Sequence, residues 1–127
     1  MTPVVVTGMG VVTPIGTGVE AFWDALVSGR SGAGPIEGFD ASGYATRIAC
    51  QVRDFDPARY MDRRAAARCD RFAQLGIAAG VLAREDAGLG DGGDRTRAGV
   101  VVGSGIGGLY TIEEQHDQLR DGGTRRV

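Results

Sequence analysis

The segment AGVVVGSGIGG at residues 98–108 decides the fold, because a run of valines leads directly into closely spaced glycines. The valines at 100–102 are typical of a strand buried on both faces of a parallel sheet. Glycines follow at 103, 105, 107 and 108, where the backbone must turn tightly or approach another group closely. Apolar residues then recur at helical spacing from Leu109 to Leu119. The segment therefore predicts a strand, a glycine loop and a helix, and ligand sites in α/β proteins gather at such strand ends.

The same glycines match the GxGxxG pattern of dinucleotide-binding turns, with Gly103, Gly105 and Gly108 in the three glycine positions. Such proteins carry an acidic residue about 20 residues later, at the end of a second strand. Here no second strand pattern appears between this loop and residue 127. A nucleotide-binding α/β module stays open as an alternative, as does a loop whose glycines serve only close packing.

Composition places the chain among globular proteins of single-domain size. It has 127 residues, 43% hydrophobic residues and a formal net charge of −2, and all 14 basic residues are arginine. This balance excludes a generally nucleic-acid-binding chain but leaves room for a local basic patch. No apolar run approaches the length of a membrane span, and the N-terminus shows no signal-peptide pattern. We therefore expect a cytoplasmic protein with neither nucleic acid nor membrane as a partner.

The nucleophilic and metal-ligating side chains are sparse. Cys50 and Cys69 have no metal-site spacing and are expected to be free thiols. His116 is the only histidine, and it falls among acidic residues on the predicted C-terminal helix. We predict no metal site.

The N-terminal part predicts another strand and a helix. Val4–Thr13 has the composition of a buried strand, and the apolar spacing from Val19 to Val27 predicts an amphipathic helix that places Trp23 in the core. Thr17 with Glu20 has the form of a capping box, and Gly29 suits the C-terminal cap.

The middle of the chain is less regular before a long helical stretch begins. Thr46–Val52 predicts a short strand with Cys50 buried, and Pro57 suits the start of a helix. The longest helix is predicted from Arg63 to Gly88. Its expected core stripe consists of Phe72, Leu75, Ala79, Leu82 and Ala83. The resulting order of strands and helices predicts an α/β layered fold.

Five segments, in order, carry a family resemblance: VVVTGMGVVTPIG, FWDALVSGRSG, FDASGYATRIA, MDRRAAARCDRF and VVGSGIGGLYTIEEQH. Together they resemble the N-terminal part of a β-ketoacyl-acyl-carrier-protein synthase of the elongating type II class, over essentially all 127 residues. The GSGIGG form of the loop favours the fatty-acid enzyme over an aromatic polyketide ketosynthase, which stays an alternative. A structural or interaction remnant without activity stays open as a third class of function.

The resemblance implies a thiolase-like α/β fold, of which residues 1–127 are an incomplete N-terminal portion, and a homodimer. It implies decarboxylating condensation without a metal or organic cofactor, on acyl chains held by the pantetheine arm of an acyl carrier protein. The family's nucleophilic cysteine, its two histidines and its lysine would lie beyond residue 127. We therefore expect no catalytic residue in this stretch, neither Cys50, Cys69 nor His116, and no condensing activity from it alone.

Two features of the chain match functional positions of the family. Ile106 matches the position that lines the acyl-chain pocket and can gate it, and the alternative is an ordinary core isoleucine. Arg64 and Arg68, with Arg63, match the segment in which basic residues meet the acidic carrier protein. The alternative for these arginines is a solvated basic face.

Overall fold

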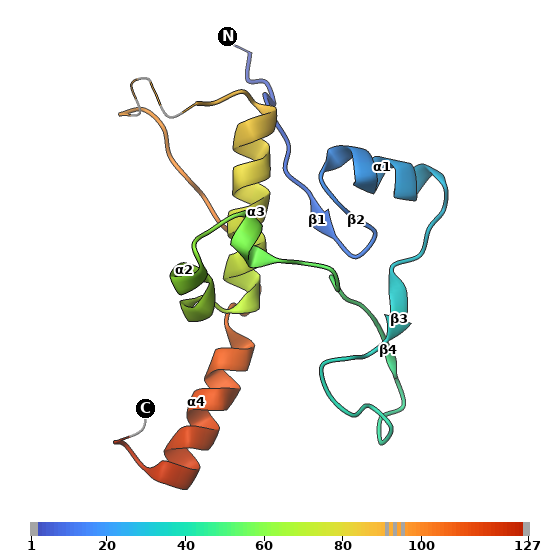
Figure 1. The fold of residues 1–127 in the computed structure, drawn as a ribbon, viewed down its shortest axis with the longest axis vertical. Helices are drawn as coiled ribbons and strands as arrows, with labels where there is room; N and C mark the ends of the chain where they lie inside the picture. The colour runs from blue at the N-terminus through green and yellow to red at the C-terminus, as the bar shows by residue number, and fades with distance from the viewer. Residues whose placement is uncertain (1–2, 91, 93, 95, 126–127) are drawn as a thin grey trace. The chain divides into compact units, whose positions relative to one another are not determined.

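The computed structural model describes residues 3–90, 92, 94 and 96–125. The chain forms two compact units, residues 1–56 with 78–91 and residues 57–77 with 92–127. Figure 1 shows the elements along the chain. They are β1 (Val12–Thr13), β2 (Gly16–Thr17), α1 (Val19–Val27), β3 (Ala33–Pro35), β4 (Ile48–Cys50), the 3₁₀ helix η1 (Pro57–Arg59), α2 (Arg63–Arg68), α3 (Arg71–Asp86) and α4 (Leu109–Gly122).

The first unit contains two short antiparallel strand pairs. β1 pairs with β2, placing Val12 opposite Thr17, and β3 pairs with β4, placing Gly34 opposite Ala49. The Thr13 hydroxyl closes the first hairpin, because it donates to the Gly16 carbonyl at 3.0 Å and accepts from the Ile15 N–H at 3.3 Å. Serine and threonine hydroxyls stabilise turns in this way.

The buried parallel strands predicted at Val4–Thr13 and over residues 98–102 are wrong for the described residues. Only Val12 and Thr13 of the first run form a strand, and Val4 is 99% exposed. In the second unit the valine run is irregular backbone, with Val101 99% exposed. A strand exists only where a neighbour accepts and donates its backbone hydrogen bonds, and neither run has such a neighbour within its own unit.

Helix α1 occupies the predicted residues but begins differently. Its N-cap is Gly18, with φ 88° and ψ 155°, and no side chain caps the helix, so the predicted Thr17–Glu20 capping box is wrong. Glycine readily adopts this positive φ, and the Gly18 N–H donates to the Val11 carbonyl at 2.8 Å. The helix ends as predicted, because Gly29 has φ 68°. Trp23 is 59% exposed, so its predicted place in the core is also wrong.

The middle segment follows the prediction in outline. β4 lies inside the predicted range, and η1 begins at Pro57 as its chemistry indicates. Cys50 is exposed, which contradicts the prediction that it is buried. Successive strand residues point to opposite faces, so Cys50 shares a face with Ile48, and both are exposed, whereas Ala49 on the other face is half-buried.

The long helix predicted from Arg63 is two helices, because Cys69 has extended backbone with φ −99° and ψ 130°. Residues 71–77 of α3 belong to the second unit and residues 78–86 to the first. Ala78 is fully buried. Phe72, expected in the core stripe, is exposed. The other four residues of the predicted stripe, Leu75, Ala79, Leu82 and Ala83, are half-buried.

The side of α3 that carries the small residues Ala79 and Ala83 packs against backbone. A Cβ built at Gly8 would lie 2.5 Å from the Ala83 carbonyl oxygen, and one at Gly10 would overlap the Ala79 carbonyl oxygen. The Met9 N–H between these glycines donates to Asp86 at 2.8 Å. The two glycines therefore let the chain lie directly on the helix.

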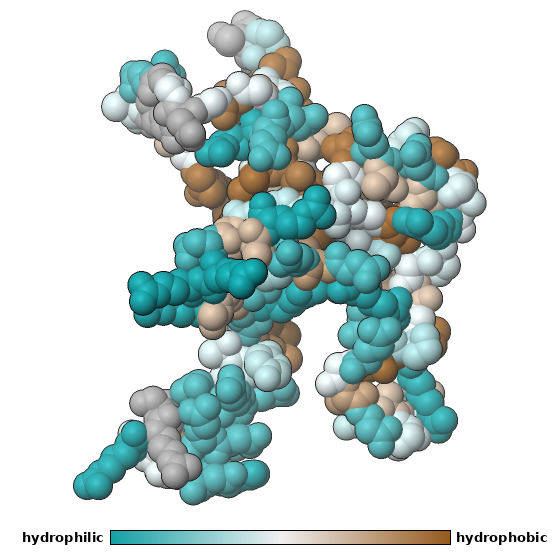
Figure 2. All heavy atoms as spheres, in the orientation of Figure 1, coloured by the Kyte–Doolittle hydropathy of each residue, from teal (hydrophilic) through white to brown (hydrophobic). Residues whose placement is uncertain are grey.

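Helix α4 is found where the apolar spacing predicts it, and its C-cap is Gly123, which has φ 68°. Figure 2 shows that the face of α4 turned to the viewer is largely hydrophilic. Among the described residues, no helix is both long and apolar enough to cross a bilayer.

The exposed valines predict how the 127-residue chain behaves alone. Unpaired β-branched segments with apolar side chains facing water associate with one another, so we expect a self-associating protein that binds a hydrophobic dye. Light scattering after gel filtration and dye fluorescence measure this. A monomer with one sharp thermal transition and no dye binding would contradict the prediction.

Candidate functional site

The predicted carrier-binding arginines lie on α2 in the second unit. The Asp62 carboxylate caps this helix, accepting from the backbone N–H groups of Arg64 at 2.9 Å and Ala65 at 3.0 Å. Arg64 and Arg68 are four residues apart and so share one side of the helix, with Arg63 beside them. All three are exposed, and none forms an ion pair with another described residue. The structure thus presents three uncompensated positive charges on one short helix.

Asp70 lies in the connection between α2 and α3, one residue beyond the C-cap Cys69, and joins this connection to α4. Its backbone carbonyl accepts from Gln74 at 3.1 Å, which starts α3. One oxygen of its carboxylate, Oδ2, accepts from the Thr111 backbone N–H at 3.0 Å and from the Thr111 hydroxyl at 2.8 Å. Residues 41 positions apart in the chain are therefore held together by a single carboxylate.

This contact completes the start of α4. The N-cap of α4 is Gly108, which has no side chain to accept the free N–H groups of the first turn. The Asp70 carboxylate, which comes from the connection between α2 and α3, accepts one of them and places a negative charge at the positive end of the helix dipole.

The last two glycines of GSGIGG make the contact possible. A Cβ at Gly108 would lie 3.1 Å from Asp70 Oδ2, so any larger residue would push the carboxylate away. Gly107 has φ 86°, a left-handed conformation that favours glycine. A Cβ built at Gly107 would lie 3.7 Å from the Phe72 ring. The glycine loop is thus fixed against the residues that begin α3.

A hollow of about 510 Å³ surrounds this junction. It is lined by the end of α2, the start of α3 and the first turns of α4, namely Ala67, Arg68, Cys69, Asp70, Arg71, Gln74, Tyr110, Thr111 and Glu114. Arg68 therefore belongs both to the basic surface of α2 and to the wall of this hollow.

Hydrogen bonding lowers the pKa of Asp70 below its ordinary value of 3.8. The Thr111 backbone N–H is the largest cause and the Thr111 hydroxyl the second, with smaller contributions from the N–H groups of Arg71 and Phe72. Because the folded protein favours the ionised form, this carboxylate stabilises the fold above pH 3.8, and its contribution is lost as the pH falls through its lowered pKa.

We therefore expect the stability difference between the full-length protein and its Asp70→Ala variant to shrink between about pH 5 and pH 2. Urea unfolding at several pH values measures this difference. Asp40 and Asp94 also have lowered pKa values, through Ser42 and Thr96, but their contributions cancel in the comparison. A difference that stays constant to pH 2 would show that the Asp70–Thr111 contact does not stabilise the ionised form.

Ile106 lies in the irregular loop before α4 and is 75% exposed. Gly107 alone separates it from the Gly108–Asp70 contact. Ile106 is not among the residues that line the hollow at this junction. Its acyl-pocket role stays a prediction, as do the roles of the three arginines.

The geometry counts against the nucleotide alternative. A dinucleotide pyrophosphate binds at the N-terminus of the helix that follows the glycine loop. Here the Asp70 carboxylate already accepts the Thr111 N–H in that first turn, and its negative charge would repel phosphate.

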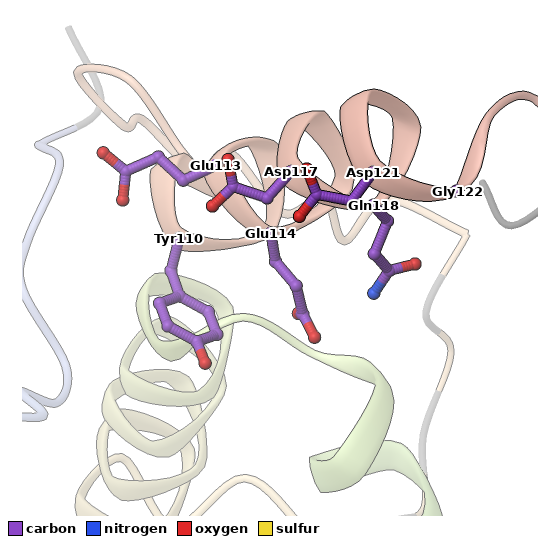
Figure 3. A pocket seen from close by; sticks show the side chains of 7 residues that line it. All are labelled: Tyr110, Glu113, Glu114, Asp117, Gln118, Asp121 and Gly122. Carbon is purple, nitrogen blue, oxygen red and sulfur yellow. The ribbon is translucent and has the colours of Figure 1, made fainter.

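Another hollow, of about 550 Å³, lies along α4 and is strongly acidic. It is lined by Tyr110, Glu113, Glu114, Asp117, Gln118, Asp121 and Gly122. Figure 3 shows Glu113, Asp117 and Asp121 following one another along the helix. Within the part of the chain that the structure describes, no group of three or more acidic, cysteine or histidine side chains could hold a metal ion.

The reactive side chains of the chain are not assembled into a site. Cys50 is exposed in the first unit, and Cys69, in the second, caps the end of α2. His116 is exposed on α4, with its Nδ1 3.8 Å from Asp117. Neither cysteine contacts a base among the described residues.

Sequence reasoning missed Asp70 and Thr111. Aspartate directly before Arg71 and Phe72 is an N-cap signal, which would have divided the long helix correctly. No local signal pairs Asp70 with Thr111, because the contact depends on how the two helices pack.

Comparisons with known proteins bear directly on the family. The sequence profile described as "Beta-ketoacyl synthase, N-terminal domain" matches residues 1–127. The chain is 49% identical to 3-oxoacyl-[acyl-carrier-protein] synthase 2 of Vibrio harveyi and 48% identical to that of Vibrio cholerae, each over 98% of this chain and 30% of the relative. A chloroplastic 3-oxoacyl-[acyl-carrier-protein] synthase I of Hordeum vulgare is 42% identical, over 98% of this chain and 28% of the relative.

A solved structure agrees. The ishigamide ketosynthase/chain length factor is similar with a TM-score of 0.77 and 36% identity, over 94% of this chain and 30% of that one. The chain thus spans about 30% of the length of these relatives. The likeness confirms the thiolase-like α/β fold class, although the predicted sheet is not formed by the described residues. The profile match and the identities show that the chain belongs to the β-ketoacyl synthase family, in the region of its N-terminal domain.

Proposed function

We propose that this chain is the N-terminal part of a 3-oxoacyl-[acyl-carrier-protein] synthase that elongates fatty acids. The identity of 41–49% to synthases of this name along nearly the whole chain carries the proposal. The alternative of a polyketide ketosynthase is supported less, since the ketosynthase/chain length factor is 36% identical. Residues 1–127 precede the nucleophile motif in this proposal and have no condensing activity alone.

The proposed reaction has two halves. A cysteine thiolate in the rest of the protein attacks the acyl thioester, the carbon–sulfur bond to the carrier breaks, and the carrier thiol leaves with a proton. Malonyl carrier protein then loses CO₂, and the resulting carbanion attacks the acyl-enzyme. A carbon–carbon bond forms, the bond to the enzyme sulfur breaks, and the thiolate is restored.

This chain contributes binding rather than chemistry. Arg63, Arg64 and Arg68 would attract the acidic carrier protein, since their charges are exposed and uncompensated among the described residues. Ile106 would line the acyl-chain pocket, its wall completed by the rest of the protein. The enzyme would act as a cytoplasmic homodimer, with the carrier's pantetheine arm delivering the substrate.

The decisive experiment uses the full-length protein with acyl and malonyl carrier proteins. Release of labelled CO₂ together with a 3-oxoacyl carrier protein one two-carbon unit longer supports the fatty-acid reaction. Products extended by several unreduced units would support the polyketide alternative. No CO₂ release, with saturable thermal stabilisation by NAD or ATP, would replace the proposal with a nucleotide-binding module.

A further inference from the structure

The Asp70 carboxylate lies between the two functional features proposed for this chain. Along the chain, one residue separates it from Arg68, the last residue of α2. The carboxylate accepts a hydrogen bond from the Thr111 hydroxyl and lies against Gly108, and one residue separates Gly108 from Ile106. Two residues of extended chain span at most about 7 Å, so both features are tied closely to this carboxylate.

The anchorage at this point depends on few interactions. Glycines flank Ile106 on both sides, and the loop before α4 forms neither helix nor strand among the described residues. Gly108 offers no cap of its own. Two hydrogen bonds to one carboxylate oxygen fix the start of α4, and hydrogen bonds to ionised groups are the stronger kind.

We propose that Asp70 is a positioning residue, which holds the start of α4, and with it the Ile106 loop, against the end of the arginine helix α2. Loss of the contact frees the loop at its C-terminal side, so the Ile106 side chain no longer has one fixed place. This inference rests on the proposed function, because it assigns the loop a part in selecting acyl chains.

The test compares four variants of the full-length protein. Asp70→Ala removes the acceptor, and Thr111→Val removes only the hydroxyl donor while nearly keeping the shape and the backbone N–H. Thr111→Ser keeps both donors and serves as the conservative variant. Asp117→Ala is the matched control, since it removes an exposed carboxylate from α4 that does not contact the loop.

Hydrogen–deuterium exchange of residues 103–112 measures how firmly the start of α4 is held, and it does not require an active enzyme. We expect Asp70→Ala and Thr111→Val to exchange roughly three- to tenfold faster in this segment, and Thr111→Ser and Asp117→Ala to match the unaltered protein. Unchanged exchange in Thr111→Val and Asp70→Ala would overturn the anchorage.

Acyl transfer from short and long acyl thioesters tests whether Asp70 positions the Ile106 loop for the selection of acyl chains. We expect Asp70→Ala and Thr111→Val to change the ratio of kcat/KM between the two lengths by roughly three- to tenfold, with Thr111→Ser unchanged. Equal losses at both lengths would overturn the positioning role even where exchange has changed. If the unaltered protein transfers no acyl group, the proposed function fails, and the exchange result still decides the anchorage.

Discussion

Replacement of Ile106 by phenylalanine in the full-length protein should reduce transfer of long acyl chains about 5- to 150-fold and leave short ones nearly unaffected. Overpacking a closed wall costs about 1–3 kcal/mol, and each 1.4 kcal/mol is a factor of ten. Short chains escape because they need not pass the enlarged side chain. Glycine on both sides lets the loop yield in part, which favours the lower end of this range.

The measurement is acyl transfer to the enzyme from thioesters of increasing chain length. Ile112→Phe is a matched control, because it makes the same change at an exposed position on α4, outside the glycine loop. Equal losses at every length, together with a lowered Tm, would identify Ile106 as an ordinary core residue. Ile106 is exposed in this chain, so a core role would require the remaining protein to cover its side chain.

Helices α1 and α4 were predictable because their signals are local. Apolar spacing identified α1 and α4, and Gly29 and Gly88 end their helices with φ of 68° and 65° as the sequence indicates. Pro57 started η1 for an equally local reason. Family membership was predictable too, since the five quoted segments extend over the whole region that the relatives match.

The strands and the site contact were not predictable in the same way. A run such as Val100–Val102 indicates a tendency towards burial, but pairing requires a partner that the described residues of its unit do not supply. The Asp70–Thr111 contact joins positions 41 residues apart, and neither residue indicates the other. Asp70 as an N-cap was available locally and was overlooked because the flanking residues suit a continuous helix.

The arginines of α2 lead to the second large expected effect. Arg64→Glu with Arg68→Glu should weaken binding of the acyl carrier protein by the full-length enzyme about 5- to 30-fold at low salt. An exposed ion pair contributes up to about 1 kcal/mol, and reversal replaces attraction by repulsion, so two reversals cost roughly 1–2 kcal/mol. The difference should fade as salt is added, because these charges are exposed and are therefore screened.

Titration calorimetry of the carrier at several salt concentrations measures the effect, and acyl transfer from a small thioester without the carrier provides the comparison. Arg47→Glu is the charge-reversal control, since Arg47 is exposed and lies before β4 in the other unit. We expect this control to bind the carrier as the unaltered enzyme does, and transfer from the small thioester to be unchanged in every variant. The two substrates share the acyl group and differ only in the carrier, so a docking role affects transfer from the carrier-bound substrate alone. An equal loss of transfer from both substrates would therefore mean that Arg64 and Arg68 maintain the local structure of α2.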